Sequence, residues 1–166
     1  MSVDMFWRRV DPGVVQGLEP AELRTLVPYW YDDRFQQETT ARITVGAEDT
    51  GALIGELLRL GAGDGPDAYG AWLAVDGADG LGGDHMVGVL TPEEVAKATE
   101  FLSRAEPAAL MQQLRPKLAV AAREMGYKRA FDDEWAQTVV ADTQDLTELF
   151  RLAGAAGEAV IVAMVA

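Results

Sequence analysis

Hydrophobic residues follow two different patterns along this chain, and the continuous pattern predicts strands. Residues Ala159–Val165 form an unbroken apolar run that is rich in β-branched side chains. A short run of this kind is typical of a central strand covered on both faces. Residues 5–10 are also rich in bulky apolar side chains, and Asp11-Pro12-Gly13 follows them. We therefore predict a first strand that ends in a turn.

The periodic pattern predicts helices, and two of them lie in the first half of the chain. Residues 19–27 predict a short helix that has Pro20 in its first turn and is limited by Pro28. Residues 53–60 follow Glu48-Asp49-Thr50 and repeat leucine at helical spacing. This spacing predicts an amphipathic helix.

The clearest helix start is at Thr91. Its hydroxyl can cap the helix, Pro92 fits a first turn that needs no N–H, and Glu94 can complete a capping box. The apolar spacing that follows predicts a helix to about Arg104.

Two more helices are predicted downstream. One begins at Pro107, and Pro116 is expected to break or kink it into two helices that meet at an angle. The other follows Asp132 and is expected to end near Gly154 or Gly157.

Residues 61–83 are dense in glycine. Within them we predict a buried strand at residues 69–75, with loop on either side. Together these elements predict an α+β fold: a small mixed sheet that includes the N- and C-terminal strands is packed against several helices. The length suits one domain over residues 1–166.

Three motifs in the second half of the chain are those of a known family. Leu90-Thr91-Pro92-Glu93-Glu94-Val95 opens a helix, Tyr127 and Phe131 precede an acidic helix, and Leu149-Phe150 is followed by Ala155-Ala156-Gly157-Glu158-Ala159-Val160-Ile161. Through them, roughly residues 70–166 resemble the YfbM-like family of uncharacterised bacterial proteins. The resemblance implies an α+β fold and no established activity. Around residues 48–57, the aspartate-lysine-tryptophan-histidine helix typical of relatives is not recognisable.

Charge and composition narrow the possible functions. The chain has 27 acidic and 14 basic residues, so its net charge is −13. Nucleic-acid binding depends on Lys and Arg, so we expect no nucleic-acid partner. The absence of cysteine excludes disulfides, thiolate catalysis and cysteine-ligated metals. An acidic surface suits another protein with a basic surface.

The start of the chain has no basic run followed by an apolar stretch. No segment approaches the roughly 20 apolar residues of a membrane helix. We therefore expect a cytoplasmic protein without membrane contact.

Residues suited to catalysis are few. His85 is the only histidine, and Ser2 and Ser103 are the only serines; none has a recognisable catalytic partner in the sequence. The acidic residues 132–134 are better explained as favourable charges at a helix N-terminus. The loop at residues 76–84 does not fit the calcium-loop pattern. We expect no catalytic residue, no cofactor and no metal.

Aromatic residues at 29–35 lie among charges, as either a ligand-facing patch or an anchor against the core. Two functional hypotheses follow. The favoured one is a non-catalytic cytoplasmic protein-interaction domain with an acidic surface. The alternative is a small-molecule-binding protein or enzyme whose cleft is lined by Trp30, Trp72, His85 and Tyr127. The candidate binding residues are Tyr29, Trp30, Tyr31, Trp72, His85 and Tyr127.

Overall fold

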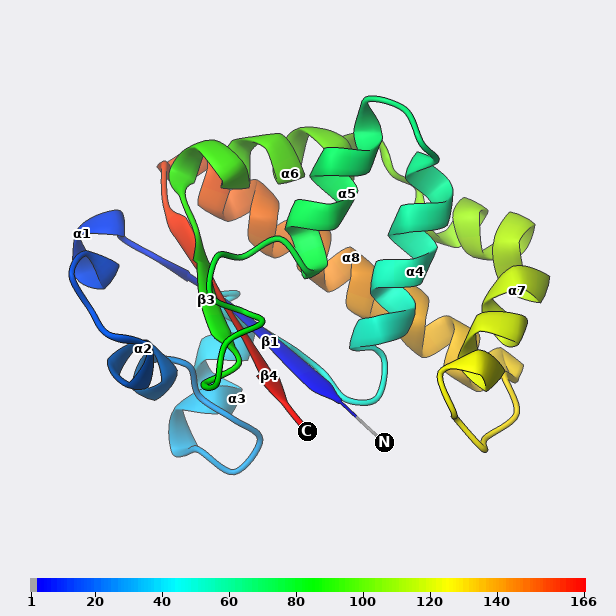
Figure 1. Ribbon diagram of the computed structural model, residues 1–166, viewed down its shortest axis with the longest axis horizontal. Coiled ribbons are helices and arrows are strands. Elements are labelled where there is room, and N and C mark those ends of the chain that lie inside the picture. Colours follow the sequence, from blue (N-terminus) through cyan, green and yellow to red (C-terminus); the bar gives the residue numbers. More distant parts are fainter. Residues whose placement is uncertain (1–2) are drawn as a thin grey trace.

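A four-stranded sheet lies between two groups of helices (Figure 1). The computed structural model describes residues 3–166. The elements are, in chain order, β1 (Asp4–Val10), α1 (Pro12–Val15), α2 (Pro20–Leu26), α3 (Asp33–Thr40), β2 (Thr44–Ala47), α4 (Gly51–Ala62), α5 (Asp67–Val75), β3 (Val87–Leu90), α6 (Pro92–Arg104), α7 (Pro107–Glu124), α8 (Asp133–Ala156) and β4 (Ala159–Val165). The fold class is α+β, as predicted.

The strand order in the sheet is β2-β1-β4-β3, so the first and last strands of the chain are its two inner strands. They pair along their whole length, from Asp4 opposite Val165 to Val10 opposite Ala159, so the start of β1 lies beside the end of β4 (Figure 1). All pairings are antiparallel, so the expectation of a mixed sheet is wrong in this detail. The apolar sequence of β4 reflects cover on both faces, which an antiparallel strand can also have.

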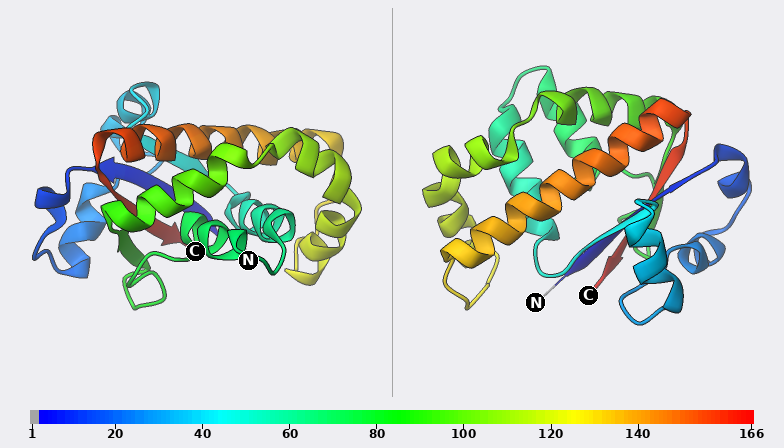
Figure 2. Two further views of the ribbon diagram at one scale, coloured as in Figure 1. Left: turned by 90° about the horizontal axis from the view of Figure 1, so that it is seen from above. Right: turned by 180° about the vertical axis from the view of Figure 1, so that it is seen from behind.

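The two faces of the sheet have separate cores. On one face, Trp7, Val160 and Val162 are buried under the larger helical layer, and Trp7 Nε1 donates a hydrogen bond of 2.9 Å to the Ala74 carbonyl. On the other face, Phe6 and Ile161 are buried under residues of α2 and the aromatic segment that follows it. Figure 2 shows α8, the longest helix, running along the first face.

Local capping signals are confirmed at two helix ends. In α6 the Thr91 backbone N–H donates to Glu94 Oε1 at 3.0 Å, and the Glu94 N–H donates to Thr91 Oγ1 at 3.2 Å. Helix α8 ends at Gly157, whose φ of 66° lies in the left-handed region that glycine adopts at no steric cost.

The prediction of a strand at residues 69–75 is wrong, because this segment lies in α5. A short apolar run does not by itself distinguish a buried strand from a buried helix. Here Gly70 permits close packing of α5 on α6, since a Cβ at this position would come within 2.7 Å of Phe101 Cβ. The prediction that Pro116 divides a helix is also wrong. Pro116 lies inside the continuous α7 on its exposed side, where the unpaired carbonyl can face water.

Four elements were not predicted: α1, α3, β2 and β3. Two of them, α3 and β2, form one side of the site described below. No helix among residues 3–166 is both long and apolar enough to cross a bilayer.

Candidate binding groove at the sheet edge

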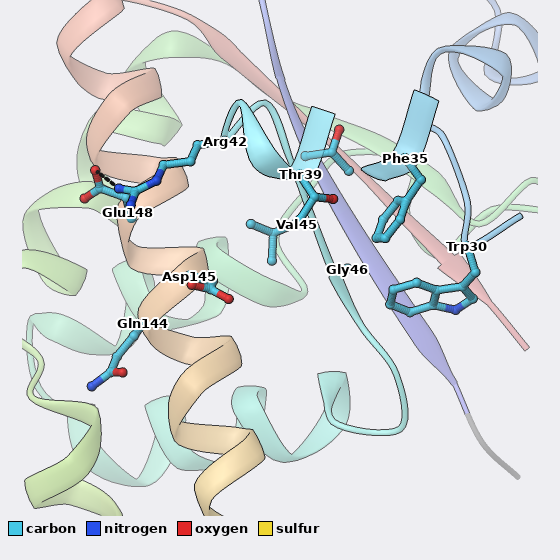
Figure 3. A pocket seen from close by; sticks show the side chains of 10 residues that line it. Trp30, Phe35, Thr39, Arg42, Val45, Gly46, Gln144, Asp145 and Glu148 are labelled. Carbon is cyan, nitrogen blue, oxygen red and sulfur yellow. Dashed lines mark hydrogen bonds and ion pairs between the residues drawn. The ribbon is translucent and has the colours of Figure 1, made fainter. Parts of the chain in front are cut away.

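The outer strand β2 carries a groove that runs between the two helical layers (Figure 3). Its first part is a hollow of about 410 Å³ with Val45 and Gly46 at its base. A second hollow of about 500 Å³ shares Trp30 and Gly46 with the first and continues past Glu48 and Asp142. We call these two adjoining hollows the edge groove.

One wall of the edge groove is aromatic and is built by the segment that leads into α3. The Trp30 ring packs against Phe6 and Phe35, with ring centroids 4.8 Å away in each case. Trp30 Nε1 donates to Asp4 Oδ2 at 2.8 Å, which fixes the indole at the start of β1. Gly46 leaves room for this ring, because a Cβ there would lie 2.6 Å from Trp30 Cη2.

Helix α3 is held against the sheet by a mostly buried ion pair. Arg8 Nε donates to Glu38 Oε2 at 3.0 Å, and Thr44 Oγ1 donates to the same oxygen at 2.7 Å. Burial by itself would raise the pKa of Glu38, but the hydrogen bonds from Arg8 and Thr44, with the charge of Arg8, lower it below 4.5. Glu38 is therefore ionised at neutral pH and links α3 to β1 and β2.

The opposite wall is polar and belongs to α8, whose Gln144, Asp145 and Glu148 line the hollow; in Figure 3 Asp145 points into it. Hydrogen bonds from Arg151, together with the charges of Arg151 and Arg42, lower the pKa of Glu148 to about 2. The charge of Glu148 is thus already balanced by two arginines, at 2.7 Å and 3.0 Å.

Asp142 and Asp145 have a different environment. No Lys or Arg lies within ion-pair distance of either carboxylate among residues 3–166. Burial raises the pKa of Asp142, a 2.5 Å hydrogen bond from Thr50 Oγ1 opposes this, and the negative charge of Asp145 raises it further. A cation placed in the groove would stabilise both carboxylates.

Of the predicted site residues, Trp30 lines the groove, whereas Tyr127 is linked to it only through Trp135. Tyr127 packs edge-on against Trp135 with a centroid distance of 5.2 Å, and Trp135 lines the second hollow together with Trp30. Burial raises the pKa of Tyr127, and the nearby carboxylates of Asp49 and Asp4 raise it further.

The other predicted residues lie elsewhere. Tyr29 packs edge-on against Phe6 as an anchor to the core, whereas the Tyr31 side chain is 99% exposed. Trp72 is half-exposed on α5 and stacks on Tyr69. His85 lies in the exposed loop before β3, where its carbonyl accepts a hydrogen bond from Arg24. The structure therefore does not bring Trp72, His85 and Tyr127 into one cleft with Trp30.

Two other chemical candidates that the structure describes, Ser103 and Asp132, are also outside the groove. The Ser103 hydroxyl donates to the Glu100 carbonyl within α6, and Ser2 lies outside the described residues. Asp132 accepts a hydrogen bond from the Trp135 N–H at the start of α8, which agrees with its prediction as a favourable charge at a helix N-terminus. Within residues 3–166, no three acidic or histidine side chains are arranged to hold a metal ion.

The sequence analysis missed Gly46, Asp142 and Asp145, which shape the groove. Asp142 and Asp145 are three residues apart and so lie on one side of a helix, which is the only signal available in the sequence. Nothing local identifies Gly46, because its role depends on Trp30 from another segment.

Comparison with solved structures shows the same fold in a bacterial protein. The chain superposes on the crystal structure of YfbM from Escherichia coli, described as a protein of unknown function, with a TM-score of 0.64. The match covers 98% of this chain and 99% of that chain, at 14% sequence identity. No protein-family model matches the sequence, and no curated protein matches it. The likeness shows a shared fold over the whole chain.

Proposed function

We propose that this protein is a non-catalytic protein-interaction domain whose edge groove binds a basic segment of another protein. The observation that carries the proposal is the pair of carboxylates without cation partners, Asp142 and Asp145, opposite an aromatic wall at Trp30. Glu48 adds a further exposed acid to the second hollow. An incoming lysine or arginine side chain gains both ionic contacts and an apolar surface for its methylene groups.

The surrounding charge supports the same conclusion. With a net charge of −13, the molecule attracts basic partners at long range and accelerates their encounter. The groove then distinguishes a specific complex from general attraction, because it places acids without cation partners opposite an aromatic ring.

The test measures the binding of a short fluorescein-labelled peptide of alternating lysine and valine by fluorescence anisotropy at physiological salt. Asp145→Lys reverses one charge inside the groove, and Asp84→Lys makes the same change in the exposed loop before β3. Both variants have the same net charge, so general attraction falls equally in both.

We expect Asp145→Lys to weaken binding at least about tenfold more than Asp84→Lys, a difference of about 1.4 kcal/mol. Equal losses in the two variants would show that binding follows overall charge, and the proposal would be wrong. Failure of the unmodified protein to bind the peptide would also overturn it.

We further propose that the chain is a distant YfbM-like protein. The support is the match of fold along the entire chain together with the helix start at Thr91 and the Tyr127 and Phe131 motif. The test is the crystal structure of a third protein whose sequence is similar both to this chain and to YfbM. That protein should have the strand order β2-β1-β4-β3 and a long helix before the last strand. A different strand order in the intermediate would contradict it.

A further inference from the structure

We infer that the basic segment binds in an extended conformation and pairs its backbone with Gly46, adding a strand to the open edge of β2. The inference rests on the proposed function and specifies how the edge groove recognises its partner. Addition of a strand to an exposed sheet edge is a general mode of peptide recognition, in which backbone hydrogen bonds supply affinity and alternate side chains supply specificity.

The hydrogen-bond pattern of the sheet determines which backbone groups of β2 face outward. The Arg9 N–H donates to the Ile43 carbonyl at 3.0 Å, and in an antiparallel pair the bonded residues alternate. With Trp7 opposite Val45 and Phe6 opposite Gly46, the backbone of Val45 faces β1 and that of Gly46 faces away from it. The hydrogen bonds of β4 follow the same alternation. The Met164 N–H donates to the Met86 carbonyl, so the backbone of Met164 faces away from β1.

Gly46 is the accessible point on this edge. Thr44 also directs its backbone outward, but the residue is completely buried. Gly46 is partly exposed and lines both hollows of the edge groove. Its N–H and carbonyl can therefore form the pair of hydrogen bonds that a neighbouring strand requires.

The two edges of the sheet differ in a way that supports this assignment. At the outer edge of β3, the Val89 N–H donates to the Asp79 carbonyl at 3.2 Å, so the preceding loop pairs with that edge. The edge of β2 is not paired by any strand of the chain within residues 3–166. Sheet edges are normally protected, and an open one beside a groove is suited to a partner strand.

Side-chain alternation then predicts the sequence of the bound segment. Gly46 shares its face of the sheet with Phe6, where Trp30 lies, whereas Val45 shares its face with Trp7, on the side of α8. A partner residue opposite Gly46 would direct its side chain to the aromatic wall, and its two neighbours would direct theirs toward α8. The carboxylates on that side that lack an arginine partner are Asp142 and Asp145. We therefore assign the order basic, apolar, basic to the three central residues of the partner segment.

The experiment uses the full chain and the lysine-valine peptide with two modified versions. In one, all valine amides are N-methylated; in the other, all lysine amides are N-methylated. Methylation removes the N–H donor while leaving the side chains and their charges unchanged. Because successive residues of a strand bond in opposite directions, only one of the two sets can face β2.

We expect one methylated peptide to bind at least about tenfold more weakly than the parent and the other to bind within about threefold of it. An antiparallel partner predicts that the valine set is the sensitive one. Amide hydrogen exchange by NMR gives a second measurement: saturation with the parent peptide should slow exchange at Gly46 at least about tenfold and leave Val45 and Ala47 unchanged.

The outcomes separate this inference from the proposed function. Equal binding of both methylated peptides, or no slowing of exchange at Gly46, would exclude strand addition. If Asp145→Lys still weakened binding selectively in that case, the acidic groove would remain the binding site, with recognition through side chains alone. Equal losses for Asp145→Lys and Asp84→Lys would instead overturn the proposed function itself.

Discussion

Replacement of Glu38 by glutamine tests whether the ion pair with Arg8 holds α3 on the sheet. The Glu38 carboxylate accepts hydrogen bonds from Arg8 Nε at 3.0 Å, Arg8 Nη2 at 3.2 Å and Thr44 Oγ1 at 2.7 Å. Both side chains of the pair are mostly buried, with 19% of Arg8 and 11% of Glu38 exposed. Glutamine keeps the size of the side chain and removes its charge, so Arg8 loses its counter-ion.

The expected loss of stability follows from the geometry. Two opposite charges about 4 Å apart attract by about 4 kcal/mol at an effective dielectric constant of about 20. Relief of the desolvation of the carboxylate, and the hydrogen bonds that glutamine can still accept, offset about half of this. We expect Glu38→Gln to lower the free energy of unfolding by about 2 kcal/mol and the melting temperature by about 4–8 °C.

The loss should depend on pH. The pKa of Glu38 in the folded protein is below its usual value of 4.5. A carboxyl group with a lowered pKa stabilises the fold above its unfolded-state pKa, and the stabilisation disappears as the pH falls through the folded-state value. The difference between the unmodified protein and Glu38→Gln should therefore be complete at neutral pH and should shrink as the medium is acidified.

Urea denaturation followed by circular dichroism at several pH values measures this difference. Glu124→Gln is the matched control, because Glu124 is exposed at the end of α7, and the change there should alter stability by less than about 0.5 kcal/mol. A loss in Glu38→Gln no larger than that of the control, or one that stays constant through the acidic range, would refute the assigned role of the ion pair.

Three other changes have defined outcomes in the same denaturation assay. Burial and the charge of Asp145 raise the pKa of Asp142 despite the hydrogen bond from Thr50, so Asp142→Asn should increase the free energy of unfolding at neutral pH. This gain should vanish as the pH falls below 3.8, the usual pKa of an aspartate. A loss of stability at neutral pH would contradict the raised pKa of Asp142. Thr91→Ala removes the side-chain cap of α6 and should lower the free energy of unfolding by about 1 kcal/mol. An unchanged midpoint of urea denaturation would show that the cap contributes nothing. Gly157→Ala places a Cβ at a φ of 66° and should cost about 1 kcal/mol, and a stabilised variant would refute this explanation.

Elements with strong local signals could be predicted from the sequence. The capping box at Thr91, the apolar run Ala159–Val165 and the spacing of leucines in α4 each specify a structure through residues that are neighbours in the chain. In these cases the local preference and the tertiary environment agree. The resulting prediction of a sheet that includes the first and last strands, with helices packed on it, is correct.

Elements that depend on distant residues could not be predicted. Segment 69–75 is apolar enough for either a strand or a helix, and its packing against Phe101 decides the outcome. Strand β2 has only four residues, one of them glycine, so its own propensity for strand is low. It forms because β1 offers pairing partners from Met5 to Arg8. Helix α3 has a local signal that was missed, the Asp32 carboxylate that accepts a hydrogen bond from the Arg34 N–H.

The aromatic segment shows why the candidate site was only partly anticipated. Among its members, Tyr29 anchors the chain to Phe6, Tyr31 faces solvent and Trp30 lines the groove. Adjacent residues of the same chemical type thus have different roles, because the direction of each ring depends on how the backbone turns into α3. A sequence reveals that rings are present and gives no information about the direction in which each one points.

The edge groove depends on β2, an element with a weak local signal that forms through its pairing with β1. Gly46 has no side chain, and this allows Trp30 to cover one side of β2; the same absence leaves the outward backbone of Gly46 reachable from the groove. A larger residue at this position would displace the aromatic wall and cover the edge at once. The edge of β3 is closed by its own loop at Asp79, so the chain is able to protect a strand edge where binding is not required. The open edge of β2 therefore requires a separate explanation, and a basic partner strand satisfies both its unpaired backbone groups and the carboxylates beside it.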